Sequence, residues 1–105
     1  MNGLWIAYFN AGAAHGNGIA VLRSGEILGG DFAHTWVGTY EEEGAKLYAR
    51  VRVAPCLPQQ EGEPAIPDHP RMMTLSGSCS ESDAKLTGHA DDSDVPVTIE
   101  LHKAA

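Results

Sequence analysis

This sequence is poor in positive charge and in long apolar runs. Seven Lys and Arg residues stand against fourteen Asp and Glu, which gives a formal net charge of −7. An acidic surface repels phosphate backbones and anionic lipid headgroups, so we expect no direct contact with nucleic acid or with a membrane. No stretch approaches the roughly 20 apolar residues of a transmembrane helix. The first residues also lack the basic flank and apolar run of a secretory signal. We therefore expect a cytoplasmic protein.

Cysteine is scarce, and motifs of catalysis are missing. Cys56 and Cys79 stand in neither a Cys-x-x-Cys motif nor a metal-ligand spacing. Two thiols in a chain without an export signal are more often reduced, so free thiols are favoured over a single disulfide. The five histidines have no paired spacing, and there is no nucleophile-elbow motif. We expect no enzyme activity, no cofactor and no metal site.

What the sequence does have is period-2 alternation of apolar and polar residues, the pattern of β-strands with one buried face. The clearest case is Lys46 to Val53, with a predicted inward set of Leu47, Ala49, Val51 and Val53. A second clear case has the predicted inward set Val95, Val97, Ile99 and Leu101. Weaker cases occupy residues 4–9, 19–23, 34–40, 72–79 and 85–90.

Short turns separate these segments. Ser24-Gly25 places a glycine where a hairpin needs positive φ, and Asp91-Asp92-Ser93-Asp94 can turn through side-chain bonds to its own backbone. About eight short strands with hairpin-sized connections and no helical period predict an all-β antiparallel barrel or sandwich. A chain of 105 residues has room for one cored domain, so we expect residues 1–105 to form a single one.

One segment interrupts the alternation. Residues 54–70 contain five of the six prolines, and proline cannot donate a backbone hydrogen bond to a strand ladder. We therefore predict a Pro-rich loop at 54–70. Loops of that length in a compact domain are usually either functional or disordered, and both interpretations stay open.

Motifs in the first half of the chain resemble a known family. They are Gly3-Leu4-Trp5, Gly18-Ile19 with Val21, Gly25, Ile27 with Gly29-Gly30-Asp31, and Trp36 with Gly38. Together they resemble the GrlR-type negative regulators of type III secretion gene expression. The resemblance implies a lipocalin-like up-and-down barrel, a homodimer and a central apolar cavity. It also implies transcription regulation through binding of a transcriptional activator, without contact with DNA.

The same resemblance implies a partner-binding site. The family carries an acidic cluster on an exposed loop, and the matching place here holds Glu41, Glu42 and Glu43, followed by Gly44. The run is one acid shorter than the family pattern and lacks its alternation of Glu and Asp. From the residues alone, a solvated turn explains three adjacent carboxylates better than a binding site does, and only the resemblance makes the two interpretations comparable. A second acidic group is expected to be plain surface: Glu81, Asp83, Asp91, Asp92 and Asp94.

Aromatic and small residues suggest an alternative function. Trp5, Phe9 and Trp36 are expected in the core, and they could line a ligand site in the lumen. Small residues at inward positions would leave space there: Ala7, Ala20, Ala49 and Gly77. The alternative to a regulator is therefore a lipocalin-like carrier of an apolar small molecule. A third hypothesis is that the protein is an inert remnant, or a subunit that is active only in an oligomer.

Gly29-Gly30 is followed by neither a helix nor a lysine, so it is not predicted to bind phosphate. We expect a β-bulge or a sharp strand bend where another backbone comes close. Asp31 is expected to cap the following turn through an Asx-type hydrogen bond.

Overall fold

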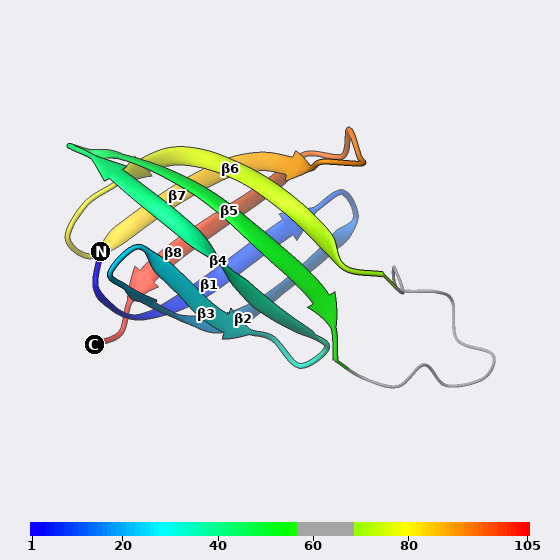
Figure 1. Ribbon diagram of the computed structural model, residues 1–105, viewed down its shortest axis with the longest axis horizontal. Coiled ribbons are helices and arrows are strands. Elements are labelled where there is room, and N and C mark those ends of the chain that lie inside the picture. The colour runs from blue at the N-terminus through cyan, green and yellow to red at the C-terminus, as the bar shows by residue number, and fades with distance from the viewer. Residues whose placement is uncertain (57–68) are drawn as a thin grey trace.

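Eight antiparallel strands form a closed barrel in the computed structural model of the chain, which describes residues 1–56 and 69–105 (Figure 1). Each strand pairs with the next along the sequence, and β8 closes the barrel on β1. The strands are β1 (Gly3–Ala11), β2 (Ala14–Arg23), β3 (Glu26–Gly30), β4 (His34–Glu43), β5 (Lys46–Pro55), β6 (Arg71–Cys79), β7 (Asp83–Ala90) and β8 (Val97–Lys103). The predicted all-β up-and-down barrel of eight strands is confirmed. The described part of the chain has no helix that could cross a membrane.

The alternation in β5 is confirmed by burial. Leu47, Ala49 and Val51 are buried inside the barrel, and Val53 is half-buried against the same core. In the last strand the inward set begins at Val97 and not at Val95, because Val95 precedes β8 and is 46% exposed. Pro96 cannot donate to a ladder, and the Val95 amide instead donates to Ser93 Oγ at 3.1 Å.

The hairpin between β2 and β3 turns as the sequence predicts. Ser24 and Gly25 both have positive φ, 51° and 82°. Arg23 pairs with Glu26 across them, as in a two-residue hairpin of type I′. The glycine position was predicted, whereas the left-handed conformation of Ser24 was not.

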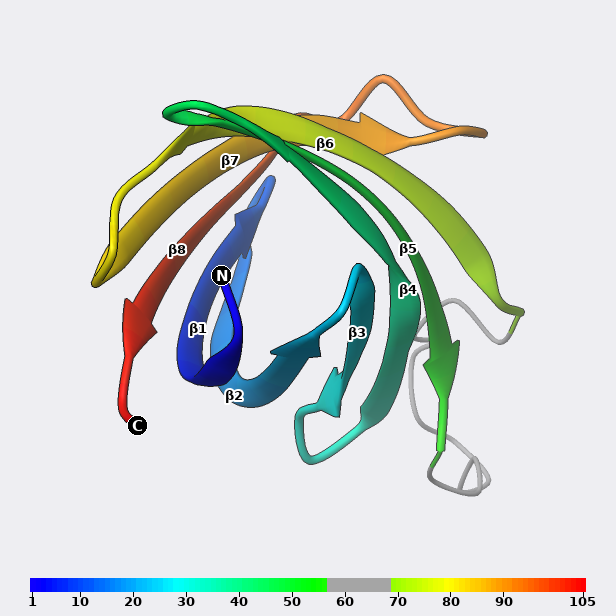
Figure 2. The ribbon, with the colours of Figure 1, turned by 60° about the vertical axis from the view of Figure 1, so that its left-hand side comes forward.

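The Gly29-Gly30 pair lies in a regular ladder, so the predicted β-bulge is wrong. Gly29 pairs with Ala20 on one side and Trp36 on the other, and the register continues through Gly30. The predicted close approach of backbones is confirmed, since a Cβ at Gly29 would collide with the Ile19 carbonyl oxygen. Figure 2 shows how the strands curve around the barrel axis here.

The turn after this pair is capped as predicted. Asp31 Oδ1 accepts hydrogen bonds from the backbone amides of Ala33 at 2.7 Å and His34 at 2.8 Å. This Asx-type turn leads the chain from β3 into β4.

The Pro-rich segment begins later than predicted. Ala54 and Pro55 belong to β5, because the first two residues of β4 pair with them: Thr35 with Ala54 and His34 with Pro55. Residues 57–68 of the predicted loop lie outside the described residues.

Candidate functional site

The barrel encloses a cavity of about 280 Å³. Its walls are mostly apolar, and Ala7, Ala20 and Ala49 contribute small side chains to them. These three are buried and face inward, as their place in the alternation predicts. Gly77 does not line the cavity. At that point β6 and β7 approach so closely that a Cβ on Gly77 would collide with the Lys85 carbonyl oxygen.

The three predicted aromatic residues separate into two groups. Phe9 and Trp36 line the cavity and meet edge to face, with ring centroids 5.9 Å apart and planes at 87°. Trp5 is fully buried and does not line the cavity. The predicted lumen set therefore reduces to Phe9 and Trp36.

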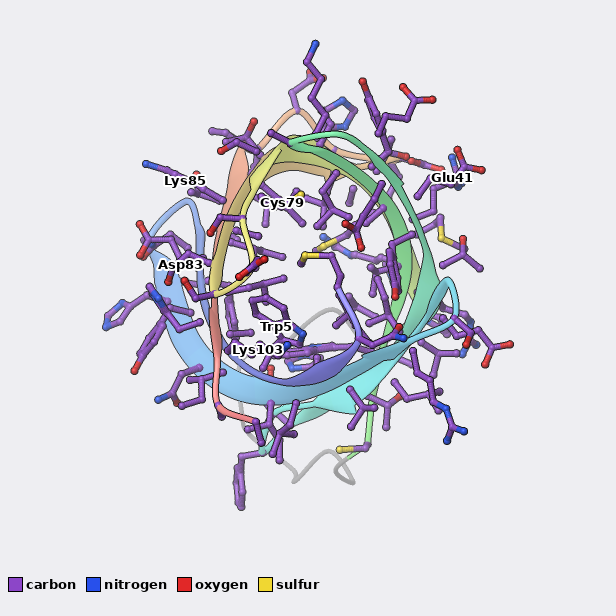
Figure 3. All side chains as sticks on the ribbon, turned by 90° about the vertical axis from the view of Figure 1, so that its left-hand side faces the viewer. Trp5, Glu41, Cys79, Asp83, Lys85 and Lys103 are labelled. Carbon is purple, nitrogen blue, oxygen red and sulfur yellow. The ribbon has the colours of Figure 1, made fainter. Side chains whose placement is uncertain are left out.

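One end of the barrel, which we call the Trp5 end, is filled by the chain's own first residues. Trp5 Nε1 donates a hydrogen bond to the Met1 carbonyl oxygen at 2.9 Å. The ammonium group of Met1 pairs with the Glu42 carboxylate at the surface, while the Met1 side chain is 1% exposed. Lys103 Nζ lies 5.9 Å from the Trp5 ring centroid. In Figure 3, which looks onto this end, Trp5 and Lys103 lie within the ring of strands.

At the opposite end, which we call the Arg71 end, polar side chains line the cavity. They are Asp31, His34, His69 and Arg71. His34 Nδ1 lies 3.1 Å from Asp31 Oδ1, the same oxygen that caps the turn. The Asp31 side chain is 10% exposed. Its carboxylate lies against two backbone amides and the His34 imidazole.

Arg71 is the residue that sequence reasoning missed. It is the first residue of β6, one position before the strand predicted at 72–79, and it pairs with Val53. The alternation could have revealed it, because Met73 and Leu75 face inward and Arg71 continues their phase. Its Nε is inaccessible to solvent and has no hydrogen-bond partner within residues 1–56 and 69–105.

His69 and Asp92 form a polar pair beside Arg71. Their Nε2 and Oδ2 atoms lie 3.4 Å apart. The hydrogen bond from His69, aided by the positive charge of Arg71, holds the pKa of the Asp92 carboxyl below its ordinary value. Both side chains are more than half exposed.

The three glutamates do not share one surface, because they lie in β4 and not in a turn. Side chains alternate along a strand, so Glu42 turns toward the Met1 ammonium at the Trp5 end. Glu41 and Glu43 are exposed on the outer face, opposite Tyr48 and Lys46 of β5. Figure 3 shows Glu41 pointing away from the barrel.

The remaining polar groups are surface features. All five residues of the second acidic group are exposed, as predicted. Asp83 accepts from Ser82 and pairs with His102 Nδ1 at 2.8 Å, and Asp91 pairs with Arg50 at 3.0 Å. Cys56 and Cys79 are free thiols, as predicted. Across residues 1–56 and 69–105, no three His, Cys, Asp or Glu side chains gather as metal ligands would.

No protein-family model matches this sequence, and a search of curated proteins finds no match. The resemblance to GrlR-type regulators therefore rests on the motifs between Gly3 and Gly38 and stays a prediction.

Proposed function

We propose that this protein binds an apolar small molecule in the lumen of its barrel. The observation that supports this most directly is the cavity of about 280 Å³ with mostly apolar walls. An eight-stranded barrel has an interior that side chains can just fill, or that can hold one small ligand. Here alanines occupy inward positions where larger residues would close the space. The cavity lies near the lower limit of typical ligand pockets, which suits a single small ligand.

The arrangement of the two ends supports the same proposal. Trp5 and the Met1 segment fill one end, so the cavity has an apolar floor there. Its ionisable lining residues are confined to the Arg71 end. Ligand pockets commonly combine apolar walls with a few placed polar groups that fix orientation.

A titration with an uncharged dye tests this function. N-phenylnaphthylamine fluoresces in apolar surroundings, and we expect saturable binding to the wild type. Ala20→Leu and Ala49→Leu would fill the cavity from opposite walls and should each weaken dye binding. Ser76→Leu, which makes a small-to-large change on the outer face of β6, is the matched control. Absence of saturable binding to the wild type would refute the proposal.

A second candidate is the regulatory role that the family resemblance implies. In this candidate, the protein sequesters a transcriptional activator through the outer face of β4. Glu41 and Glu43 support it because both are exposed, and neither forms an ion pair within the described ranges 1–56 and 69–105. Glu42 is removed from this candidate site because it pairs with the Met1 ammonium.

Affinity capture from the host lysate tests the second candidate. We expect a DNA-binding regulator to be retained by the wild type and lost by the double variant Glu41→Lys/Glu43→Lys. The double variant Glu81→Lys/Asp94→Lys makes the same change of charge on the second acidic group and should retain it. Equal retention by all three proteins would contradict a role for Glu41 and Glu43.

The homodimer implied by the resemblance would need exposed apolar surface. Such residues lie on the outer face of β2, β3 and β4: Ile19, Val21, Leu28 and Val37. Leu28 pairs with both Val21 and Val37, so the apolar side chains are neighbours across the strands. If this face joins two copies, Leu28→Lys should convert a dimer to a monomer in sedimentation velocity. A wild type that sediments as a monomer would rule the dimer out.

A further inference from the structure

Arg71 places a charged group at the wall of a mostly apolar cavity. It faces inward from the first position of β6 and lines the cavity beside Val53 and Met73. Its Nε atom is shielded from solvent and has no hydrogen-bond partner in residues 1–56 and 69–105. A buried donor without a partner is costly, and native proteins rarely leave one. The position therefore favours a ligand that supplies the missing acceptor.

Neighbouring acids are engaged with other groups. Asp31 Oδ1 accepts from two backbone amides and faces His34 Nδ1. Asp92, which does not line the lumen, pairs with His69. Neither carboxylate satisfies Arg71 Nε, so an acceptor entering the cavity would not have to displace them.

Guanidinium geometry selects the chemistry of that acceptor. The Nε–H and an adjacent Nη–H of arginine form two parallel donors that match the two oxygens of a carboxylate. A hydroxyl or an ether offers a single neutral oxygen and forms a weaker bond. Apolar walls strengthen the interaction, because water competes little in such surroundings.

The distribution of polar residues fixes the direction of the ligand. All ionisable residues of the cavity lining lie at the Arg71 end, while Ala7, Leu22 and Leu47 form its other end. A charged head would therefore be stabilised at Arg71, and an apolar body would lie beside Phe9 and Trp36 toward the Trp5 end.

We infer that the ligand of this lumen is an amphipathic acid, with one terminal carboxylate bound by Arg71 and an apolar body in the cavity. This inference rests on the proposed lumen function and adds the class and orientation of the ligand. Dodecanoate, dodecanol and dodecyl phosphate serve as probes, because they share an alkyl chain of the same length and differ in the head group.

Displacement of N-phenylnaphthylamine from the wild type and three variants provides the test. Dodecanoate should displace the dye at a concentration about tenfold to hundredfold below that of dodecanol, as expected for a charge-assisted bond. Arg71→Met should abolish this difference between dodecanoate and dodecanol. Arg71→Lys should retain part of it, since the charge remains without the two-donor geometry. Arg52→Met, on the exposed outer face of β5, is the matched control and should behave as the wild type.

Each result separates the inference from the proposed function. Equal displacement by acid and alcohol from the wild type overturns the carboxylate assignment and leaves lumen binding in place. Tighter binding of dodecyl phosphate overturns it in favour of a phosphate head. A protein that binds neither the dye nor any probe refutes both proposals. If Arg71→Met fails to fold by circular dichroism, the wild-type ranking and Arg71→Lys still decide.

Discussion

The two ends of this barrel use inward positions differently. At the Trp5 end the three largest fully buried side chains, Trp5, Leu22 and Leu47, fill the interior. There the amide of Leu4 also donates to the Ala105 carbonyl, which ties the two ends of the chain together. At the Arg71 end, half-buried aromatic side chains and ionisable groups surround a cavity instead.

This difference shows how one sheet can serve two purposes. Large apolar residues stabilise the fold by removing their surface from water, whereas a cavity forgoes some of that packing. We expect substitutions at the Trp5 end to change stability most. Substitutions at the Arg71 end should mainly change binding. Each prediction below tests that division.

The largest effect should come from the tryptophans. Trp5→Ala removes a fully buried side chain and its hydrogen bond to Met1, so it should lower the free energy of unfolding by about 3–5 kcal/mol. Trp36→Ala removes a half-buried ring that contacts Phe9 at the cavity, and its cost should be about 1–2 kcal/mol. Urea denaturation measures both. Equal losses would show that the two ends contribute alike.

Next in size is reversal of charge at Glu42. Glu42→Lys would place a cation beside the Met1 ammonium, so repulsion would replace attraction, and it should destabilise the protein by about 1–2 kcal/mol. Glu41→Lys makes the same change on the outer face and should stay within about 0.5 kcal/mol of the wild type. Thermal unfolding at low and high salt measures the difference, which salt should reduce. A neutral effect of Glu42→Lys would exclude the ammonium pair as a support of the Trp5 end.

A smaller effect is expected at the turn that borders the Arg71 end. Asp31→Ala removes the acceptor of two backbone amides and should cost about 1 kcal/mol. Asp31→Asn keeps an oxygen at that place and should cost less. Hydrogen exchange at Ala33 and His34 should report the loosened turn directly. Unchanged exchange in Asp31→Ala would mean that the turn holds without its cap.

Much of this fold could be read from the sequence, because a strand with one buried face records its orientation in every second residue. That regularity located the inward residues of β5, and the turn chemistry of aspartate separately indicated the Asx turn at Asp31. It did not reveal the bounds of the ladder, since these depend on the neighbouring strand. β4 extends far enough to pair with Pro55. At its other end β4 continues past Tyr40 to Glu43, which places Glu41 to Glu43 in a strand and divides them between two faces.

The candidate site was harder to predict than the fold. Whether Phe9, Trp36 and Trp5 share a cavity depends on their height along the barrel axis, which the alternation does not specify. Arg71 was missed because a charged residue at an inward position resembles the end of a strand. Its pairing with Val53 shows that it belongs to the ladder.

The smallest expected effect concerns the two cysteines, which lie at opposite ends and should differ in reactivity. Cys56 is exposed beside the β3–β4 turn, where its amide bonds to the Ala33 carbonyl. Cys79 is half-buried at the Trp5 end, and burial together with the negative charge of Glu42 raises the pKa of its thiol above the ordinary cysteine value. The thiolate is the reactive form, so at neutral pH a thiol reagent should label Cys56 several-fold faster. The variants Cys56→Ser and Cys79→Ser resolve the two rates, and Glu42→Gln should accelerate labelling of Cys79 by lowering its pKa. If Cys79 reacts as fast as Cys56 in the wild type, the Trp5 end admits solvent and reagent, and the proposed difference between the two ends would be lost.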